Sequence, residues 1–200
     1  MRNLIKFFVN LLTTLRFLSI LVLIIIFKKT SHRLFIITIS LLFLTDFIDG
    51  KLARKYKVQT IYGSNMDTIA DKALSIGLII LLLKKNKYIY LVLLGEIIIS
   101  IINTLAKLQH KKTKSSLIGK IKTWFLSITI ILSYINYFKL LKTIYVLPYI
   151  IITSLTQIYC IVDYIIYLIK QKPAPTREIK SNKNILYKLF STEYYLKTIE

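Results

Sequence analysis

Four aspartates within a short stretch of an otherwise apolar sequence are the residues best suited to chemistry. Asp46 and Asp49 lie three residues apart, and Asp67 and Asp71 lie four apart. On a helix, spacings of three and four residues return side chains to the same face, so two antiparallel helices could direct four carboxylates at one small volume. Carboxylates this close repel one another unless cations lie between them, and hard divalent cations such as Mg²⁺ or Mn²⁺ prefer oxygen ligands.

Small residues and one arginine accompany the acids. Gly50 and Ala53 follow Asp46 by four and seven residues, which places all three on one face of a continuing helix. They leave room for a ligand to approach the backbone, and Gly63 gives the chain freedom to turn before the second pair of acids. The planar guanidinium of Arg54 suits a phosphate. The pattern therefore predicts a divalent-cation site whose further ligand is a phosphate compound.

A salt-bridged structural cluster is the alternative interpretation of the same acids. A single acid near the end of a membrane helix is usually solvated and has no special role. Four acids at helical spacing are different, because ionisable groups at membrane depth are energetically costly and usually functional. Spacing favours the metal site but leaves the structural cluster open.

The composition is that of a membrane protein. Hydrophobic residues make up 55% of the 200 residues, and the mean hydropathy is +0.60. Lys and Arg number 29 against 9 Asp and Glu, but they lie between apolar runs, which favours contact with anionic lipid over nucleic acid. The single Cys160 excludes an intramolecular disulfide, and His32 and His110 lack metal-ligand spacing.

Six apolar runs predict an all-α integral membrane protein with six transmembrane helices. Several runs are short for a bilayer core of about 30 Å, so we expect the helices to continue through their polar ends, the second as far as Arg54. Residues 1–9 are expected to form an interfacial helix, and 171–200 a basic cytosolic tail after a membrane domain of residues 1–170. The predicted spans are Leu11 to Phe27, Leu34 to Ile48, Met66 to Leu83, Tyr88 to Leu105, Trp124 to Phe138 and Ile144 to Ile169.

The basic residues predict the orientation of these helices. With the N-terminus inside, the inner segments carry more than twice as many Lys and Arg as the outer loops, which favours both termini in the cytosol. The acids then lie at the cytosolic face of the cell membrane. On the opposite side we expect an aromatic belt, formed by Tyr134, Tyr137, Tyr145 and Tyr149.

The stretch from Asp46 to Asp71 resembles the signature of the CDP-alcohol phosphotransferase family. Eight positions match the pattern D-x2-D-G-x2-A-R-x8-G-x3-D-x3-D without a gap or substitution. The resemblance extends to the six-helix plan and to the place of the motif between the second and third helices.

The resemblance implies an enzyme that transfers a substituted phosphate from a CDP-alcohol, usually CDP-diacylglycerol, to a hydroxyl acceptor and releases CMP. It implies two Mg²⁺ or Mn²⁺ ions and a homodimer. It also implies that Asp71 is the base that deprotonates the acceptor. The implied metal ligands are Asp46, Asp49, Asp67 and Asp71. The residues implied to hold the cytidine diphosphate are Gly50, Ala53, Arg54 and Thr60.

Three further stretches are similar to enzymes of this family that use glycerol 3-phosphate. They are NLLTTLR at 10–16, EIIIS at 96–100 and GKIKT at 119–123. Lys120 and Lys122 could bind the acceptor phosphate as point charges, although a basic loop could equally attract lipid headgroups. The chain departs from the pattern at Gly95 and near Asn103, where such enzymes often carry arginine, and at Thr68, where they often carry proline.

Two classes of function follow. The first is a metal-dependent phosphatidyltransferase acting on glycerol 3-phosphate, with phosphatidylglycerol, inositol phosphate or serine as other acceptors. The second is a non-catalytic membrane protein that binds or transports cations. Transport would require polar residues across the membrane, whereas the acids cluster at one end of their helices. The enzyme is therefore preferred.

Overall fold

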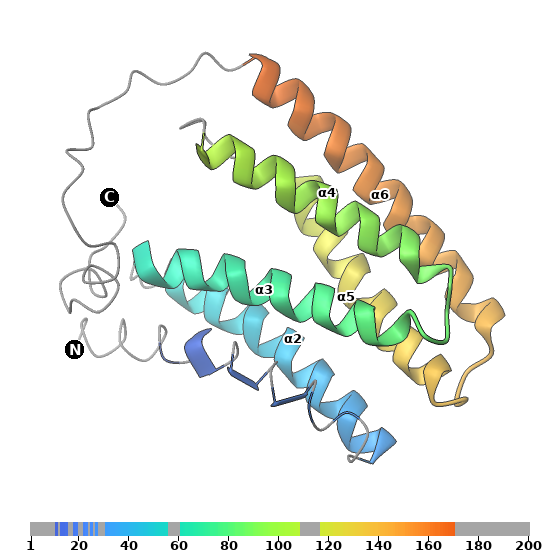
Figure 1. Ribbon diagram of the computed structural model, residues 1–200. Coiled ribbons are helices and arrows are strands. Elements are labelled where there is room, and N and C mark those ends of the chain that lie inside the picture. Colours follow the sequence, from blue (N-terminus) through green and yellow to red (C-terminus); the bar gives the residue numbers. More distant parts are fainter. Residues whose placement is uncertain are drawn as a thin grey trace. The chain divides into compact units, whose positions relative to one another are not determined.

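The structure is a computed structural model in which every described element is a helix (Figure 1). It describes residues 31–55, 61–108 and 117–170, together with residues 11, 13–15, 18, 19, 22, 23, 25 and 27. Within these ranges only the backbone is described for 49–55, 61–65, 107 and 108. The predicted interfacial helix at 1–9 and the predicted tail at 171–200 lie outside the described residues.

Five helices have defined bounds, and each overlaps a predicted span. They are α2 His32–Lys55, α3 Ile61–Leu82, α4 Ile89–Leu108, α5 Leu117–Tyr137 and α6 Thr143–Lys170. Ahead of α2, the described residues from 11 to 25 are helical. The expected continuation through polar ends is confirmed, since α2 runs on to Lys55 and α5 begins seven residues before Trp124. The apolar residues show which part of a helix can lie in lipid. Backbone hydrogen bonding continues past that part, so the helix is longer than its apolar run.

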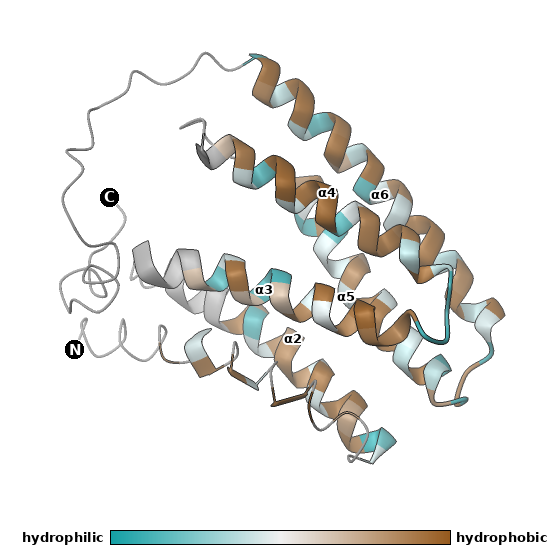
Figure 2. Cartoon of the chain, viewed as in Figure 1, coloured by the Kyte–Doolittle hydropathy of each residue, from teal (hydrophilic) through white to brown (hydrophobic). Residues whose placement is uncertain are grey.

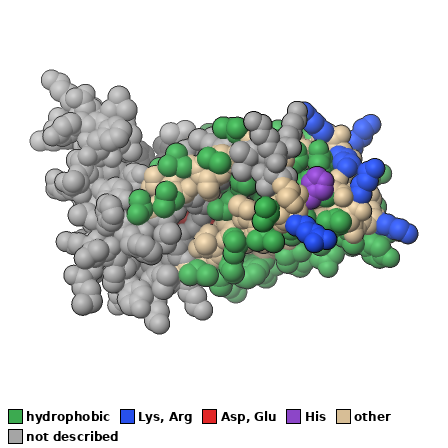
Figure 3. Space-filling view, turned by 90° about the horizontal axis from the view of Figure 1, so that it is seen from below, with side chains coloured by type: hydrophobic (Ala, Val, Ile, Leu, Met, Phe, Trp, Pro, Cys, Tyr) green, Lys and Arg blue, Asp and Glu red, His purple; other side chains and the backbone are tan. Residues whose placement is uncertain are grey.

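Three of the described helices are long and apolar enough to cross a membrane. The stretches are Ile89–Ala106, Leu117–Tyr137 and Thr143–Lys170. Their hydropathy colouring is dominated by apolar residues (Figure 2). Hydrophobic side chains also cover much of the coloured surface in Figure 3. The chain is a membrane protein.

The chain divides into two compact units, and the division falls inside α3. One unit comprises Met1–Leu74 and Lys180–Glu200, and the other comprises Ser75–Ile179. In the first unit, Phe35 and Ile39 of α2 are buried one turn apart, and the Phe35 ring lies 5.0 Å from that of Phe27. In α3, Ala70 and Leu74 are buried at the same spacing. Each helix therefore turns one apolar face inward.

In the second unit, α6 packs against both α4 and α5. The buried stripe of α6 is partly polar, with Thr153 and Gln157 one turn apart. The hydroxyl of Thr153 shares a hydrogen bond of 2.7 Å with that of Thr129 on α5. The Thr129 hydroxyl also lies 3.2 Å from the backbone oxygen of Tyr149. Hydrogen bonds between helices hold bundles together where the hydrophobic effect is weak.

The end of α5 is closed by a Schellman motif. Leu140 donates its backbone N–H to Ile135 and Lys139 donates to Asn136, at 3.0 and 2.9 Å. Lys139 has φ of 63°, the left-handed conformation that glycine usually supplies at this position. The ammonium of Lys85 donates to the carbonyl oxygen of Tyr137 and lies over its ring, 4.6 Å from the centroid. Together these contacts join the α3–α4 turn to the end of α5.

Tyr134 does not sit in an exposed aromatic belt. Its side chain is fully buried, and its hydroxyl donates 2.8 Å to the backbone oxygen of Leu78 on α3. Tyr145 is 60% exposed, as a belt residue would be. Residues in the last turns of α5 that face α3 are therefore part of the interior, which hydropathy alone does not reveal.

Candidate metal and substrate site

The helical continuation of α2 is what positions the first acids. Because the helix runs unbroken to Lys55, positions 46, 49, 50 and 53 return to one face of it. Asp67 and Asp71 occupy adjacent turns of α3, as their spacing predicts. Asp46, Asp67 and Asp71 all belong to the unit that contains Met1–Leu74. Their arrangement can therefore be described within one compact body.

Three carboxylates meet between α2 and α3. Asp46, Asp67 and Asp71 each offer one oxygen, and these oxygens all lie within 4.8 Å of one another. All three side chains are half-buried. Oxygens at this separation can share one cation, and a set of carboxylate donors suits Mg²⁺ or Mn²⁺. The predicted convergence of acids from two helices is confirmed for these three residues.

The remaining residues of the motif lie where the structure describes the backbone alone or not at all. Asp49, Gly50, Ala53 and Arg54 are helical in α2. Their side chains lie outside the described part of the chain, and Thr60 lies wholly outside it. Their assignment to metal and nucleotide stays a prediction.

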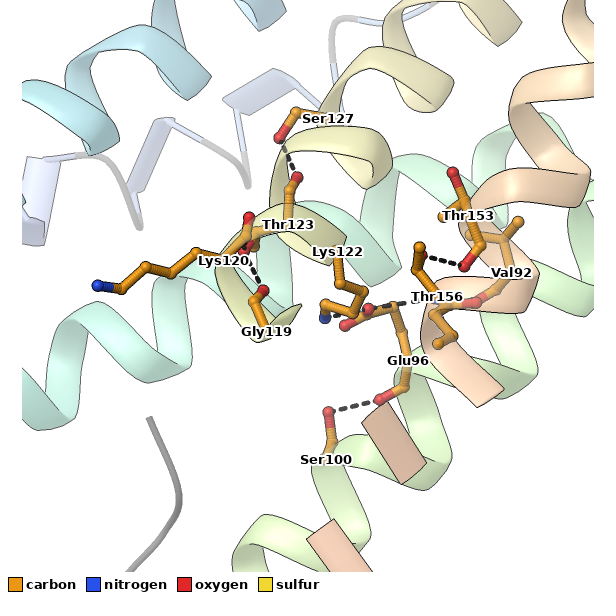
Figure 4. A network of polar contacts seen from close by, with 11 residues as sticks. Val92, Glu96, Ser100, Gly119, Lys120, Lys122, Thr123, Ser127, Thr153 and Thr156 are labelled. Atoms are coloured by element: carbon orange, nitrogen blue, oxygen red, sulfur yellow. Dashed lines mark hydrogen bonds and ion pairs between the residues drawn. The ribbon is translucent and has the colours of Figure 1, made fainter. Parts of the chain in front are cut away.

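The two lysines of the GKIKT stretch both lie in α5, but one is buried and the other is exposed. Lys122 is buried, and its ammonium lies 2.5 Å from Oε1 of Glu96 on α4. Lys120 is exposed, and Figure 4 shows its side chain extending away from Glu96. Residues two apart on a helix differ by about 200° in direction, so the two ammonium groups do not face the same volume.

Gln157 of α6 joins the pair of Glu96 and Lys122 and was not anticipated from the sequence. Its side-chain Nε2 donates 3.1 Å to the same Glu96 oxygen and 3.0 Å to the backbone oxygen of Val92. A signal was present, because Thr153 and Gln157 are polar residues one turn apart in an apolar helix. Glu96 therefore makes hydrogen bonds to two other helices.

Gly95 is explained by the same contact. A Cβ atom at position 95 would lie 2.6 Å from Cδ and 3.1 Å from Cβ of Gln157, and closer still to its Oε1. Any larger residue would have to push the Gln157 amide away from Glu96 and Val92. Position 95 departs from the family pattern, and the absence of a side chain there leaves the space that the Gln157 side chain occupies.

Comparison with known proteins agrees with the motif. Residues 7–168 match the family described as CDP-alcohol phosphatidyltransferase. The chain is 35% identical over 122 residues to a CDP-diacylglycerol–glycerol-3-phosphate 3-phosphatidyltransferase of Rickettsia felis, covering 58% of this chain and 67% of that one. Enzymes of the same name from Rickettsia typhi and Pseudomonas fluorescens are 34% and 27% identical. Those alignments cover 58% of this chain in both cases, and 68% and 62% of the respective relatives.

The family match covers most of the chain and includes all three clustered acids and both lysines. It favours the enzyme over a non-catalytic cation-binding protein, and it makes the chain a transferase of phosphatidyl groups in phospholipid synthesis. The chain belongs to the CDP-alcohol phosphatidyltransferase family.

Proposed function

We propose that this chain transfers the phosphatidyl group of CDP-diacylglycerol to glycerol 3-phosphate, giving phosphatidylglycerophosphate and CMP. The observation that carries the proposal is the meeting of Asp46, Asp67 and Asp71 oxygens within 4.8 Å, at motif positions of a phosphatidyltransferase family. The choice of acceptor rests on the names of the similar enzymes, which use CDP-diacylglycerol and glycerol 3-phosphate.

The acids would hold the divalent cations, with Asp49 as the fourth ligand. Their oxygen donors fit Mg²⁺ or Mn²⁺, and half-burial would shield the cations from bulk water without closing access to a substrate. When bound, such ions neutralise charge on a diphosphate and stabilise the departing phosphate. Gly50, Ala53, Arg54 and Thr60 would hold the cytidine diphosphate, with the guanidinium fork on phosphate oxygens.

Asp71 would accept the proton of the acceptor hydroxyl. As that proton moves to the carboxylate, the acceptor oxygen forms a bond to the β-phosphorus of CDP-diacylglycerol. The bond between the β-phosphorus and the oxygen bridging to the α-phosphorus breaks, and CMP leaves with the electron pair. Atoms and charge balance without a further reactant. Asp71 lies one helical turn after Asp67. This position would let Asp67 bind a cation while Asp71 also faces the acceptor.

The acceptor's phosphate would be bound by a cation near the start of α5. Lys120 is exposed there, as a ligand for a soluble anion must be. Lys122 is buried and paired with Glu96.

The membrane arrangement is part of the proposal. We infer six transmembrane helices in a domain of residues 1–170, an interfacial helix at 1–9 and a basic cytosolic tail at 171–200. Both termini and the acids would face the cytosol, where CMP and glycerol 3-phosphate are soluble. The family match over residues 7–168 supports a single membrane domain of this extent. We also infer a homodimer in the cell membrane, from the family resemblance.

The decisive experiment measures CMP release from CDP-diacylglycerol by the purified chain. Glycerol 3-phosphate, phosphatidylglycerol, inositol phosphate and serine are compared, each with Mg²⁺, with Mn²⁺ and with a chelator. We expect metal-dependent CMP release with glycerol 3-phosphate and phosphatidylglycerophosphate as product. Release supported only by another acceptor would reassign the acceptor, and release without metal would contradict the role of the acids.

The base assignment is tested separately with Asp71→Asn. This substitution removes the proton acceptor but preserves size, so we expect turnover to fall by at least about 100-fold while CDP-diacylglycerol still binds. Turnover at the unsubstituted rate would remove Asp71 from the base role.

A further inference from the structure

The cluster of Glu96, Lys122 and Gln157 is a buried charged site that the proposed chemistry does not use. Exposed fractions are 0% for Glu96, 5% for Lys122 and 1% for Gln157. One oxygen, Oε1 of Glu96, accepts from the Lys122 ammonium at 2.5 Å and from the Gln157 amide at 3.1 Å. The three side chains come from α4, α5 and α6, so a single carboxylate oxygen joins three helices.

The charge of Lys122 is compensated where it lies. In a low-dielectric interior an ammonium and a carboxylate in contact attract strongly, and neither is stable there without the other. A phosphate brought to Lys122 would approach Glu96 as well, and two anions at this distance repel. Binding an anionic acceptor at Lys122 would therefore require Glu96 to move or to take up a proton.

The direction of the two lysines separates their roles further. Figure 4 shows Lys122 directed at Glu96 and Lys120 directed the other way from the same helix. Lys120 is exposed, whereas Lys122 is not. One helix therefore carries one lysine suited to pairing helices and one suited to a soluble anion.

Gly95 and Gln157 complete the arrangement. With no Cβ at position 95, the Gln157 amide reaches Glu96 and the backbone of Val92. The amide gives the carboxylate oxygen a second donor, which holds it in place beside the ammonium. The contact thus favours the ion pair over any rotamer that would release Lys122.

We propose that Glu96, held by Gln157, keeps Lys122 as an internal group that joins α4, α5 and α6, and that Lys122 is therefore not a ligand of the acceptor's anionic group. The second part rests on the proposed function. The first part concerns the folded protein and stands without it.

Stability of the purified protein in detergent tests the helix pairing. Lys122→Met and Glu96→Gln each leave one buried charge without its counter-ion, and each should lower Tm by at least about 5 °C. The double variant E96Q/K122M contains no buried charge and should recover at least half of that loss. Ser100→Ala is the control, because its hydroxyl donates to the Glu96 backbone oxygen within α4. A double variant no more stable than the more stable of the two single variants would overturn the pairing, and this comparison needs only one single variant to fold.

Kinetics with glycerol 3-phosphate test the division of roles. Lys120→Met should raise KM for glycerol 3-phosphate about tenfold and leave KM for CDP-diacylglycerol within twofold. E96Q/K122M should leave KM for glycerol 3-phosphate within about threefold of the unsubstituted protein. A tenfold rise in that KM in the double variant, with Lys120→Met unaffected, would overturn the proposal. Failure of the unsubstituted protein to release CMP would contradict the proposed function instead, and the Tm comparison would still decide the pairing.

Discussion

Replacing Gly95 by alanine adds a single methyl group where Gln157 already lies. The new Cβ would lie 2.6 Å from Cδ of Gln157, well inside van der Waals contact. Gln157 can give way only by moving its amide, which would lose the hydrogen bonds to Glu96 and Val92. The substitution therefore acts through a neighbouring helix and not through α4 itself.

The expected size follows from three contributions. Loss of two hydrogen bonds, one of them to a carboxylate, costs about 2–4 kcal/mol, and residual crowding costs about 1 kcal/mol more. Alanine in a helix interior is favoured over glycine by about 1 kcal/mol. Gly95→Ala should then destabilise the protein by about 2–4 kcal/mol, which lowers Tm by roughly 5–15 °C for a chain of this size.

A double-mutant cycle with Gln157→Ala separates these contributions. Once Gln157 is truncated to alanine, the methyl group meets no amide, so the helix preference and the contact of 3.1 Å with Cβ of residue 157 remain. Gly95→Ala should then change the stability by no more than about 1 kcal/mol, so its cost of about 2–4 kcal/mol largely disappears. Thermal unfolding of the four proteins in one detergent, followed by circular dichroism, gives the four values. Equal destabilisation by Gly95→Ala with and without Gln157 would refute the reasoning.

Three further predictions follow from other contacts. Lys139→Gly should stabilise the protein by about 1 kcal/mol in thermal unfolding, because glycine adopts the left-handed conformation at φ of 63° without strain, and Lys142→Gly should not stabilise it. Tyr134→Phe should cost about 1 kcal/mol, because it removes the bond to the α3 backbone, whereas Tyr145→Phe at an exposed position should be neutral. Saturating Mn²⁺ should raise the Tm of the unsubstituted protein by about 5–10 °C but not that of Asp46→Asn. A stabilising Lys142→Gly, a neutral Tyr134→Phe or an unchanged Mn²⁺ shift in Asp46→Asn would each contradict the contact concerned.

Features that depend on one helix at a time were predictable from the sequence. The spacing of Asp46, Asp67 and Asp71 predicted two acidic faces, and the acids converge because both helices are regular through their polar ends. The apolar runs located each helix, and its polar continuation followed from the length that a bilayer requires.

Features that depend on which helices are neighbours were not predictable in the same way. The likeness of GKIKT to enzymes that use glycerol 3-phosphate predicts a ligand site at Lys122, whereas its ammonium pairs with Glu96 on the neighbouring helix α4. Tyr134 is of a residue type typical of an aromatic belt, but its hydroxyl donates to the backbone oxygen of Leu78 on α3. Sequence periodicity shows which face of a helix is polar, and it does not identify the partner on the facing helix.

The most direct test of the central claim is metal-dependent CMP release from CDP-diacylglycerol and glycerol 3-phosphate, with the lipid product identified by mass spectrometry. The clustered acids predict phosphatidylglycerophosphate and CMP in equal amounts with Mg²⁺ or Mn²⁺, and neither product with a chelator or with Asp46→Asn. Equal product formation by Asp46→Asn, or formation that survives the chelator, would contradict the claim that these acids form the metal site of a phosphatidyltransferase.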